Sequence, residues 1–525
     1  MYQLYFNGQI HTLDADRSAV SALLVYQGRI IYSGRAEDIN LPDSAISRFD
    51  LRGQHIYPGF TDSHTHIAAM AIDKERIRLD DCISRQSALE HIRKFVSSAE
   101  PGAWILGGGW NANQWQDGYP DCKVLDKITS GHPAALFNKD MHTMWLNSIA
   151  LEKCGFSEGS ADPAGGKLGR DHKGNLNGLV YEKVCETVLA QTGEISYDQF
   201  KRCMNRTWPD LYALGIVGVH SCEDLQTWSF FQRLHRENNL GLRICMHPPM
   251  ENTEQFIAAG LRSGYGDEWL RLGGLKYFVD GSLGSQTAEM FAPFEGLDQT
   301  GVAVLNEAEL SERLAYSFAN GFSATIHAIG DKANHKTLNA LEKNKSISDS
   351  FGLRNRIEHA QIINDTDIPR FHSLGVTASM QPMHLADDVK IADKYLGKRN
   401  RLCYRFGDLL NSGAKMIFGS DMPITTADPI KGIQAAVGRR YNLDKNEAVW
   451  FADQVISAQS ALHAYTVNAA YSSYEEQVKG TLTPGKVADF IAVAQPFENA
   501  DESVLSDLRV DLTVLNGTVV YQRDA

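Results

Sequence analysis

Two histidines end the stretch Tyr57-Pro58-Gly59-Phe60-Thr61-Asp62-Ser63-His64-Thr65-His66. Apolar residues precede them, and the stretch is predicted to form a short β-strand. Side chains two apart on a strand point to the same face. His64 and His66 would therefore supply half of a metal site at the C-terminal tip of this strand. The alternative is an ordinary strand cap or surface turn that binds no ion.

Apolar runs recur along the chain, most of them with a helix-like segment behind. The predicted strands span residues 57–62, 215–220, 242–247, 272–279, 322–327, 356–359, 376–381 and 415–419. Eight strands that alternate with helices predict an α/β protein with a (β/α)8 TIM barrel. Residues from about 69 to 200 break the alternation. They are expected to form a long insertion after strand 1, over the mouth of the barrel.

Both ends of the chain are rich in strand-like runs separated by hairpin turns such as Asn7-Gly8 and Asn516-Gly517. Residues 1–56 and 479–525 are therefore expected to pair into one small β-sandwich domain. Separate terminal sheets would leave the same pattern and are the alternative. The barrel domain, with its insertion, would then span residues 57–478.

The composition narrows the class of protein. The 525 residues carry a formal net charge of −13, which argues against nucleic-acid binding because no basic field would attract phosphates. The N-terminus resembles no secretory signal, and no apolar run is long enough to span a bilayer. The 8 cysteines are scattered without a CxxC pair, as in a cytoplasmic protein with reduced thiols.

Metal-binding side chains also end later strands. His327 closes the fifth strand and His359 the sixth. A lone histidine after an apolar run is commonly a core residue, but two on neighbouring strands favour metal ligands, because neutral imidazole binds zinc and similar ions. Asp421 closes the eighth strand. It would either cap a following helix or, beside a metal, bind the ion and accept a proton from water.

Lys276 lies inside the apolar run Leu272-Gly273-Gly274-Leu275-Lys276-Tyr277-Phe278-Val279. A buried ammonium is costly there, unless the side chain extends its charged end into water. The other interpretation is an amine that reacts with CO2, so that the resulting carbamate bridges two metal ions.

Taken together, these residues resemble the amidohydrolase superfamily, and the wording of the motifs is similar to its YtcJ-like, or amidohydrolase-3, branch, which includes N-substituted formamide deformylases. The matching stretches are residues 58–66, 275–285, 327–331, 356–361 and 419–421, with Gly109-Trp110 and 479–489 in addition.

The resemblance implies a binuclear metal centre. The ligands would divide between two ions: His64, His66 and Asp421 would bind one, and His327 and His359 the other, with a carboxylated Lys276 between them. A metal-bound hydroxide would attack a carbonyl carbon, and Asp421 would pass the water proton to the leaving nitrogen. Two Zn2+ ions per chain are expected, with manganese, iron or nickel as alternatives.

The resemblance also implies contacts with the substrate, namely Trp110, Trp115, His142, Trp145, His384 and Asp388. For the tryptophans, packing inside the insertion is the alternative. His220 and His247 are expected either to support the ligands from behind or to be structural, since the metal sites are already filled.

The sequence thus predicts a metal-dependent hydrolase that acts on a carbon–nitrogen bond, an amide or N-formyl amide of a small molecule. Lactone or carbamate hydrolysis at the same metals is one alternative, and a non-catalytic scaffold is another. A homodimer is the expected assembly.

Overall fold

The computed structural model describes residues 1–16, 19–112, 115, 119–139, 143–163, 165–193 and 195–524. The chain divides into two compact units, one made of Met1–Ala68 with Asn205–Ala525 and the other of Ala69–Met204. The bounds of the second unit lie close to those of the expected insertion. Within the described ranges, no helix combines the length and the apolar character needed to cross a membrane.

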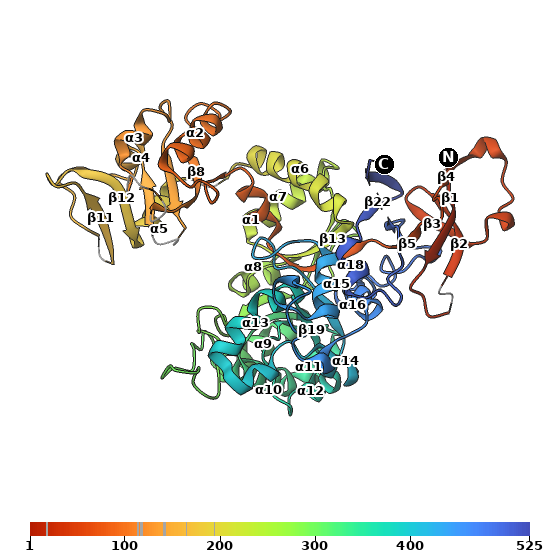
Figure 1. Ribbon diagram of the computed structural model, residues 1–525. Helices are drawn as coiled ribbons and strands as arrows, with labels where there is room; N and C mark the ends of the chain where they lie inside the picture. Colours follow the sequence, from red (N-terminus) through yellow and green to blue (C-terminus); the bar gives the residue numbers. More distant parts are fainter. Residues whose placement is uncertain are drawn as a thin grey trace. The chain divides into compact units, whose positions relative to one another are not determined.

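The first unit is an α/β structure with a barrel-like core of two parallel sheets (Figure 1). One sheet has the order β15 (Leu270–Leu272), β14 (Arg243–His247), β13 (Ile216–Cys222), β6 (Phe60–Thr65). The other has the order β16 (Leu275–Phe278), β17 (Ala324–Ala328), β18 (Arg356–His359), β19 (Thr377–Met380), β20 (Met416–Phe418). Parallel bridges join the sheets at Thr65 and Met422 and at Pro249 and Lys276.

Two predicted strands are wrong in their bounds, and a glycine explains each. The run 272–279 is divided between β15 and β16 at Gly273 and Gly274, where a Cβ would lie 2.4 Å from the His247 ring and 2.8 Å from the Ser323 carbonyl oxygen. The run 57–62 is divided at Gly59, where the chain passes from β5 (His55–Pro58) to β6. A Cβ on Gly59 would lie 2.6 Å from Val217.

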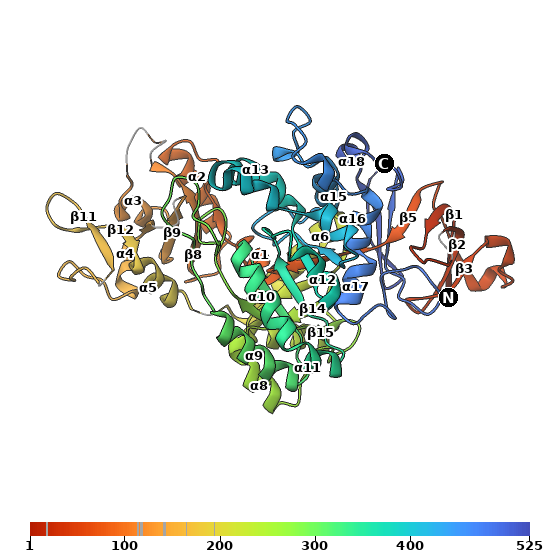
Figure 2. The ribbon, with the colours of Figure 1, turned by 90° about the horizontal axis from the view of Figure 1, so that it is seen from below.

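Helices follow most of the strands and surround them, as Figure 2 shows for those of the C-terminal half. They are α7 (Leu225–Arg236), α8 (Thr253–Ala258), α9 (Glu307–Ala319), α10 (Asp331–Lys343), α11 (Lys345–Ser350), α12 (Ile368–Leu374), α13 (Pro382–Leu396), α14 (Phe406–Asn411), α15 (Pro429–Gly438), α16 (Ala458–Tyr465) and α17 (Val467–Ser472). Side chains cap several N-termini; Asp224, for example, accepts the Thr227 N–H at the start of α7.

Strands from both ends of the chain form one eight-stranded sheet. Its order is β23 (Thr518–Gln522), β22 (Val510–Leu515), β21 (Phe490–Val493), β5, β1 (Tyr2–His11), β2 (Ala19–Tyr26), β3 (Arg29–Gly34), with β4 (Ile46–Asp50) beside β1. The two ends meet at β5, which pairs with β21 antiparallel and with β1 parallel. This sheet belongs to the same compact unit as the barrel-like core.

The second unit contains a six-stranded sheet of its own. Its order is β11 (Gly166–Arg170), β12 (Leu176–Glu182), β10 (Thr143–Leu146), β9 (Ala134–Asn138), β8 (Ile105–Trp110), β7 (Ile77–Arg78). Helices α2 (Arg85–Val96), α3 (Cys122–Asp126), α4 (Ser148–Lys153) and α5 (Lys183–Gln191) complete it. In the sequence, the division between the units falls within α1 (Ile67–Asp73) and within α6 (Tyr197–Ala213).

Candidate metal centre

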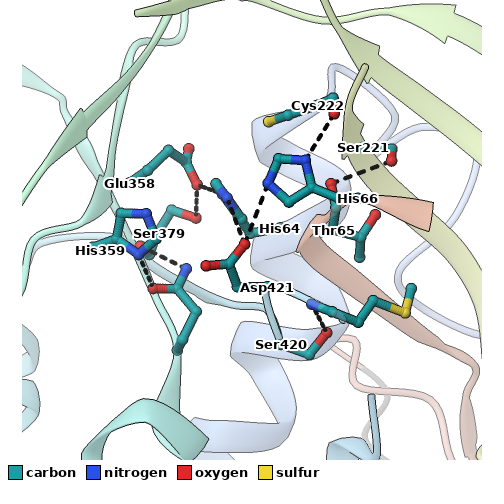
Figure 3. Close-up of polar contacts among 12 residues, drawn as sticks. His64, Thr65, His66, Ser221, Cys222, Glu358, His359, Ser379, Ser420 and Asp421 are labelled. Atoms are coloured by element: carbon teal, nitrogen blue, oxygen red, sulfur yellow. Dashed lines mark hydrogen bonds and ion pairs between the residues drawn. The ribbon is translucent and has the colours of Figure 1, made fainter. Parts of the chain in front are cut away.

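Asp421 joins two groups of potential metal ligands at the C-terminal ends of the strands. Figure 3 shows it between His64 and His66, which form the first group with it. In the first, its Oδ1 lies 3.4 Å from Nε2 of His64 and 3.4 Å from Nε2 of His66. In the second, its Oδ2 lies 3.7 Å from Nε2 of His384, whose ring stacks on His359 with centroids 6.0 Å apart. Within each group the ligand atoms lie within 4.8 Å of one another.

The backbone holds Asp421 and His359 in the left-handed region, with φ of 58° and 68°. The Asp421 N–H donates to the His64 carbonyl at 2.7 Å, and the next residue, Met422, accepts the His66 N–H at 2.9 Å. These bonds fix the end of β6 against the segment that follows β20. Non-glycine residues adopt this conformation uncommonly, and it often occurs at functional sites.

Three histidines are oriented by bonds at their Nδ1 atoms. His66 donates to the Cys222 carbonyl at 3.0 Å, His359 donates to the Gln381 side chain at 2.8 Å, and His64 donates to Glu358. A neutral imidazole with its proton on Nδ1 leaves the Nε2 lone pair for a metal. The bonds therefore set these rings in the tautomer that binds an ion.

Glu358 is the buried anion behind this centre, and no role was predicted for it. It accepts hydrogen bonds from Ser379 at 2.7 Å and from His64, which Figure 3 shows, and a third from Arg356. Burial raises the pKa of Glu358, but the Arg356 guanidinium and His64 hold it well below its usual range. The signal in the sequence is a carboxylate directly before a histidine, in the short strand Arg356-Ile357-Glu358-His359.

Electrostatics favour an ionised Asp421 and a neutral His359, whereas the carboxylates around His64 favour its protonated form. Burial raises the pKa of Asp421, but His64 and a hydrogen bond to His66 lower it to below its ordinary range. Burial and then the neighbouring His327 lower the pKa of His359 well below its usual value. For His64, burial and Lys276 lower the pKa, while Glu358 and Asp421 outweigh them and raise it.

Lys276 is buried on β16, with 4% of its surface exposed. Its charge acts on His64, His327 and His359, so the strand brings it to the same centre. Among the described residues its ammonium forms no hydrogen bond or ion pair, and it lies 5.0 Å from the centroid of the Phe278 ring.

His327 lies against His359, with ring centroids 4.6 Å apart, but its Nε2 donates to the Gly281 carbonyl at 3.0 Å. Burial, followed by Lys276, lowers its pKa to about 4. In the portion of the chain that the structure describes, neither ligand group includes His327. The second group instead contains His384, which the sequence pattern had placed with the substrate contacts.

The other residues expected to contact the substrate belong to neither ligand group among the described residues. Trp110, Trp115 and Trp145 lie in the hydrophobic core of the second unit, and each indole N–H donates to a carbonyl oxygen. This placement corresponds to the packing alternative. Asp388 accepts hydrogen bonds from Gln361 at 2.8 Å and Tyr404 at 2.6 Å, and is therefore held within α13 and its neighbours. His142 lies outside the described residues.

His220 and His247 are fully enclosed between the strands. Arg356 donates to His220 Nδ1 at 3.0 Å, and the Gly274 N–H donates to His247 Nδ1 at 3.0 Å. Burial, and then the Arg356 charge, lower both pKa values well below 6.5. Neither residue belongs to a ligand group among the described residues.

The donor set fits a divalent metal ion. It combines a carboxylate with imidazoles that are pre-oriented by second bonds, the arrangement found around bound zinc. His384 supplies a separate indication, because its buried Nε2 has no hydrogen-bond partner although it points to Asp421. A buried polar atom of this kind normally has a partner.

Comparison with known proteins agrees with this geometry. The family model described as "Amidohydrolase family" matches residues 48–521. The chain is 30% identical to the protein LONG AFTER FAR-RED 3 of Arabidopsis thaliana, over 94% of this chain and 87% of that one. It is 27% identical to YtcJ of Bacillus subtilis (strain 168), named as an amidohydrolase, over 100% of both chains.

Two further relatives bear on chemistry and fold. N-substituted formamide deformylase of Arthrobacter pascens is 24% identical over 99% of this chain and 98% of its own. The crystal structure of an uncharacterized metal-dependent hydrolase from Pyrococcus horikoshii OT3 has a TM-score of 0.81 and 26% identity, and covers 96% of this chain and 99% of its own. This chain belongs to the amidohydrolase family, in the branch of the YtcJ-like proteins, and is a hydrolase with a site for a divalent metal.

Proposed function

We propose that the protein hydrolyses a carbon–nitrogen bond, an amide or N-formyl amide of a small molecule. The observation that carries the proposal is the position of Asp421, whose two carboxylate oxygens face two different groups of histidines. One carboxylate can therefore bind an ion through one oxygen and receive a proton at the other.

The proposed centre holds two ions, with zinc as the preferred metal and manganese, iron or nickel as alternatives. His64, His66 and Asp421 would hold one ion. His359 would hold the other, with His384 favoured by the geometry and His327 by the sequence pattern. Bound divalent ions would polarise the substrate carbonyl and make water more acidic.

Lys276 would join the two ions as a carbamate formed with CO2. The unmodified ammonium is buried and forms no ion pair at contact distance among the described residues, an arrangement that costs free energy although its charge also acts on Glu358. Conversion to an anion removes this cost and adds a ligand between the two histidine groups.

Asp421 would accept a proton from the attacking water and deliver it to the leaving nitrogen. Its pKa, held below the ordinary range, keeps it ionised. Because a carboxylate with a lowered pKa is a weak base, the transfer would depend on the greater acidity of water at the bound metal ions. The delivery step is downhill because an amine leaving group is far more basic than a carboxylate.

The choice of an amide rests on chemistry and on one relative. Amide hydrolysis requires protonation of a poor leaving group, which an adjacent carboxylate can supply. The Arthrobacter pascens relative is named for removing formyl groups from N-substituted formamides. We carry this substrate class over to the present chain as the first to be tested.

The test is a screen of N-acyl and N-formyl amines, lactones and carbamates with metal-replete protein and with Asp421→Asn. We expect the wild type to hydrolyse N-formyl or N-acyl amines. The rate should be at least about a hundredfold lower in the variant because the proton acceptor is gone. Turnover of lactones or carbamates alone would replace the amide assignment. A protein that binds no metal and turns over nothing would favour the non-catalytic alternative.

Barrel closure and a terminal β-sandwich are also part of this proposal. The bridges at Thr65–Met422 and Pro249–Lys276 support a closed (β/α)8 barrel, and the core between the terminal strands supports a β-sandwich. We also keep the homodimer as the proposed assembly. The cysteines, all free, fit the proposed cytoplasmic location.

A further inference from the structure

A second cleft lies at the opposite end of the barrel-like core and contains none of the candidate metal ligands. Its walls are the C-terminal half of α7 and the segment 262–271 that leads into β15. The metal ligands follow the ends of parallel strands, whereas this segment precedes the start of one. The cleft has a volume of about 920 Å3, a size typical of small-molecule sites.

Unpaired positive charge lines this cleft. Arg236 and Arg262 are exposed, and among the described residues neither guanidinium forms a hydrogen bond or ion pair. Arg271 lies deeper, where Nη1 donates to the Gly264 carbonyl at 3.0 Å and Nε forms an ion pair with Glu475 at 3.9 Å. Two unpaired guanidiniums and a third, paired one thus line one cleft in a chain whose net charge is −13.

The one acidic side chain in the lining does not neutralise them. Asp267 Oδ2 is paired with His235 at 2.7 Å, and its Oδ1 accepts the N–H groups of Trp269 and Leu270 at 2.8 and 3.0 Å. Arg236 stands in the last turn of α7, where a cation also stabilises the helix dipole. This structural role does not account for Arg262, which lies outside the helix.

An aromatic ring stands beside the arginines. Tyr265 is 56% exposed, and within the described part of the chain its ring has no aromatic or cationic partner. Trp228 and Tyr474 also line the cleft, and the Tyr474 hydroxyl accepts the Arg354 N–H at 2.8 Å. A free aromatic face next to free guanidiniums suits a ligand that has a planar ring and an anionic group.

The segment that carries Arg262 and Tyr265 is held in place before any ligand binds. Gly264 N–H donates to the Leu272 carbonyl and Leu272 N–H to the Tyr265 carbonyl, both at 2.8 Å. Gly266 has φ of 128°, and a Cβ there would lie 2.1 Å from the Leu270 carbonyl oxygen. Because the wall is preformed, a ligand would lose little free energy in ordering it.

We propose that this cleft binds a phosphate-bearing small molecule with a planar ring, of the nucleoside monophosphate class. The phosphate would contact Arg236 and Arg262, with Arg271 behind them, and the ring would stack on Tyr265. Arginine suits this role because its planar fork binds phosphate oxygens in pairs.

The test is calorimetric titration of the full chain at low salt with adenosine monophosphate, adenosine and inorganic phosphate. Compared with the wild type, we expect R236Q/R262Q to bind adenosine monophosphate about a hundredfold more weakly, since each charged contact contributes about tenfold. Tyr265→Ala should weaken it about tenfold. Adenosine and phosphate alone should bind more weakly than the whole nucleotide.

The matched control is R35Q/R76Q, which removes two exposed arginines that also have no side-chain partner among the described residues. It should bind the nucleotide like the wild type. No binding at millimolar nucleotide would overturn the proposal, and so would equal binding by R236Q/R262Q and the wild type. If the nucleotide bound at the metal centre instead, the two proteins would bind it equally. Phosphate binding as tightly as the nucleotide would also overturn it. None of these measurements requires turnover, so they are independent of the proposed hydrolysis.

Discussion

Glu358→Gln should weaken metal binding although Glu358 belongs to neither ligand group. In the wild type, this carboxylate accepts the Nδ1 proton of His64 and is also bound by Arg356 and by Ser379. The substitution keeps the size of the side chain but removes its charge. His64 loses the anion that fixes its tautomer, and Arg356 keeps a buried charge beside a neutral amide.

The expected decreases in metal affinity and in folding stability follow from these two losses. Removing the partner that orients a metal-binding histidine typically costs a factor of about 10 to 100 in metal affinity or activity. This corresponds to about 1.4 to 2.7 kcal/mol. Breaking a buried ion pair by removing one partner costs about 3 to 5 kcal/mol of folding stability. The Glu358 side chain is 0% exposed and that of Arg356 is 2% exposed, so solvent compensates for neither loss.

The assay is metal affinity measured by titration with a competing chelator, together with the thermal unfolding temperature of the metal-free protein. Asp489→Asn is the matched control, because Asp489 forms a buried pair with Arg243 at the start of β14, away from the ligand groups. The control should lower stability but leave metal affinity unchanged. Metal affinity of Glu358→Gln within about twofold of the wild type would refute the reasoning.

Three other predictions follow from the contacts described above. His384→Asn should reduce metal affinity more than His327→Asn, because only His384 belongs to a ligand group; the reverse order would return His327 to the ligand set. Lys276→Ala should lose metal and activity, both partly restored by short carboxylic acids, whereas full activity without them would exclude the carbamate. Burial raises the pKa of Glu498, but hydrogen bonds from His11 and Tyr57 lower it to about 2, from 4.5. Because the folded-state pKa is depressed, the ionised Glu498 stabilises the fold above pH 4.5, and this stabilisation is lost as the pH falls towards 2. Glu498→Gln should therefore cost about 3 kcal/mol at pH 7, and its unfolding temperature should approach that of the wild type below pH 3. A pH-independent difference would contradict the assignment.

The alternation of apolar runs and helical segments predicted the α/β class because buried parallel strands are continuously apolar. It did not predict where a run is interrupted. The division of residues 272–279 depends on the close approach of His247 and Ser323, which are distant in sequence from Gly273 and Gly274. Only the packed structure shows that these glycines separate β15 from β16.

The sequence predicted the ligands that lie at the ends of strands, but not the ligand that lies on a helix. His64 and His359 end strands, so their convergence follows from the parallel order. His384 is the third residue of α13, and its distance from Asp421 depends on how that helix begins. Similarly, a tryptophan such as Trp110 suits a core and a substrate pocket equally well, and the choice is made by tertiary packing.

Backbone strain connects the fold to the proposed chemistry. On a regular strand, Glu358 and His359 would point to opposite faces. Here Glu358 accepts a hydrogen bond from Nδ1 of His64, while His359, the last residue of β18, has φ of 68° and belongs to the second ligand group. A left-handed histidine costs about 1 to 3 kcal/mol, and Asp421, with φ of 58°, adds a similar cost. Glycine would relieve both strains but would remove a ligand at each position. The fold therefore tolerates strain at the two residues that give the second ligand group one of its two imidazoles and its carboxylate, which is the pattern expected if metal binding, rather than stability, determines them.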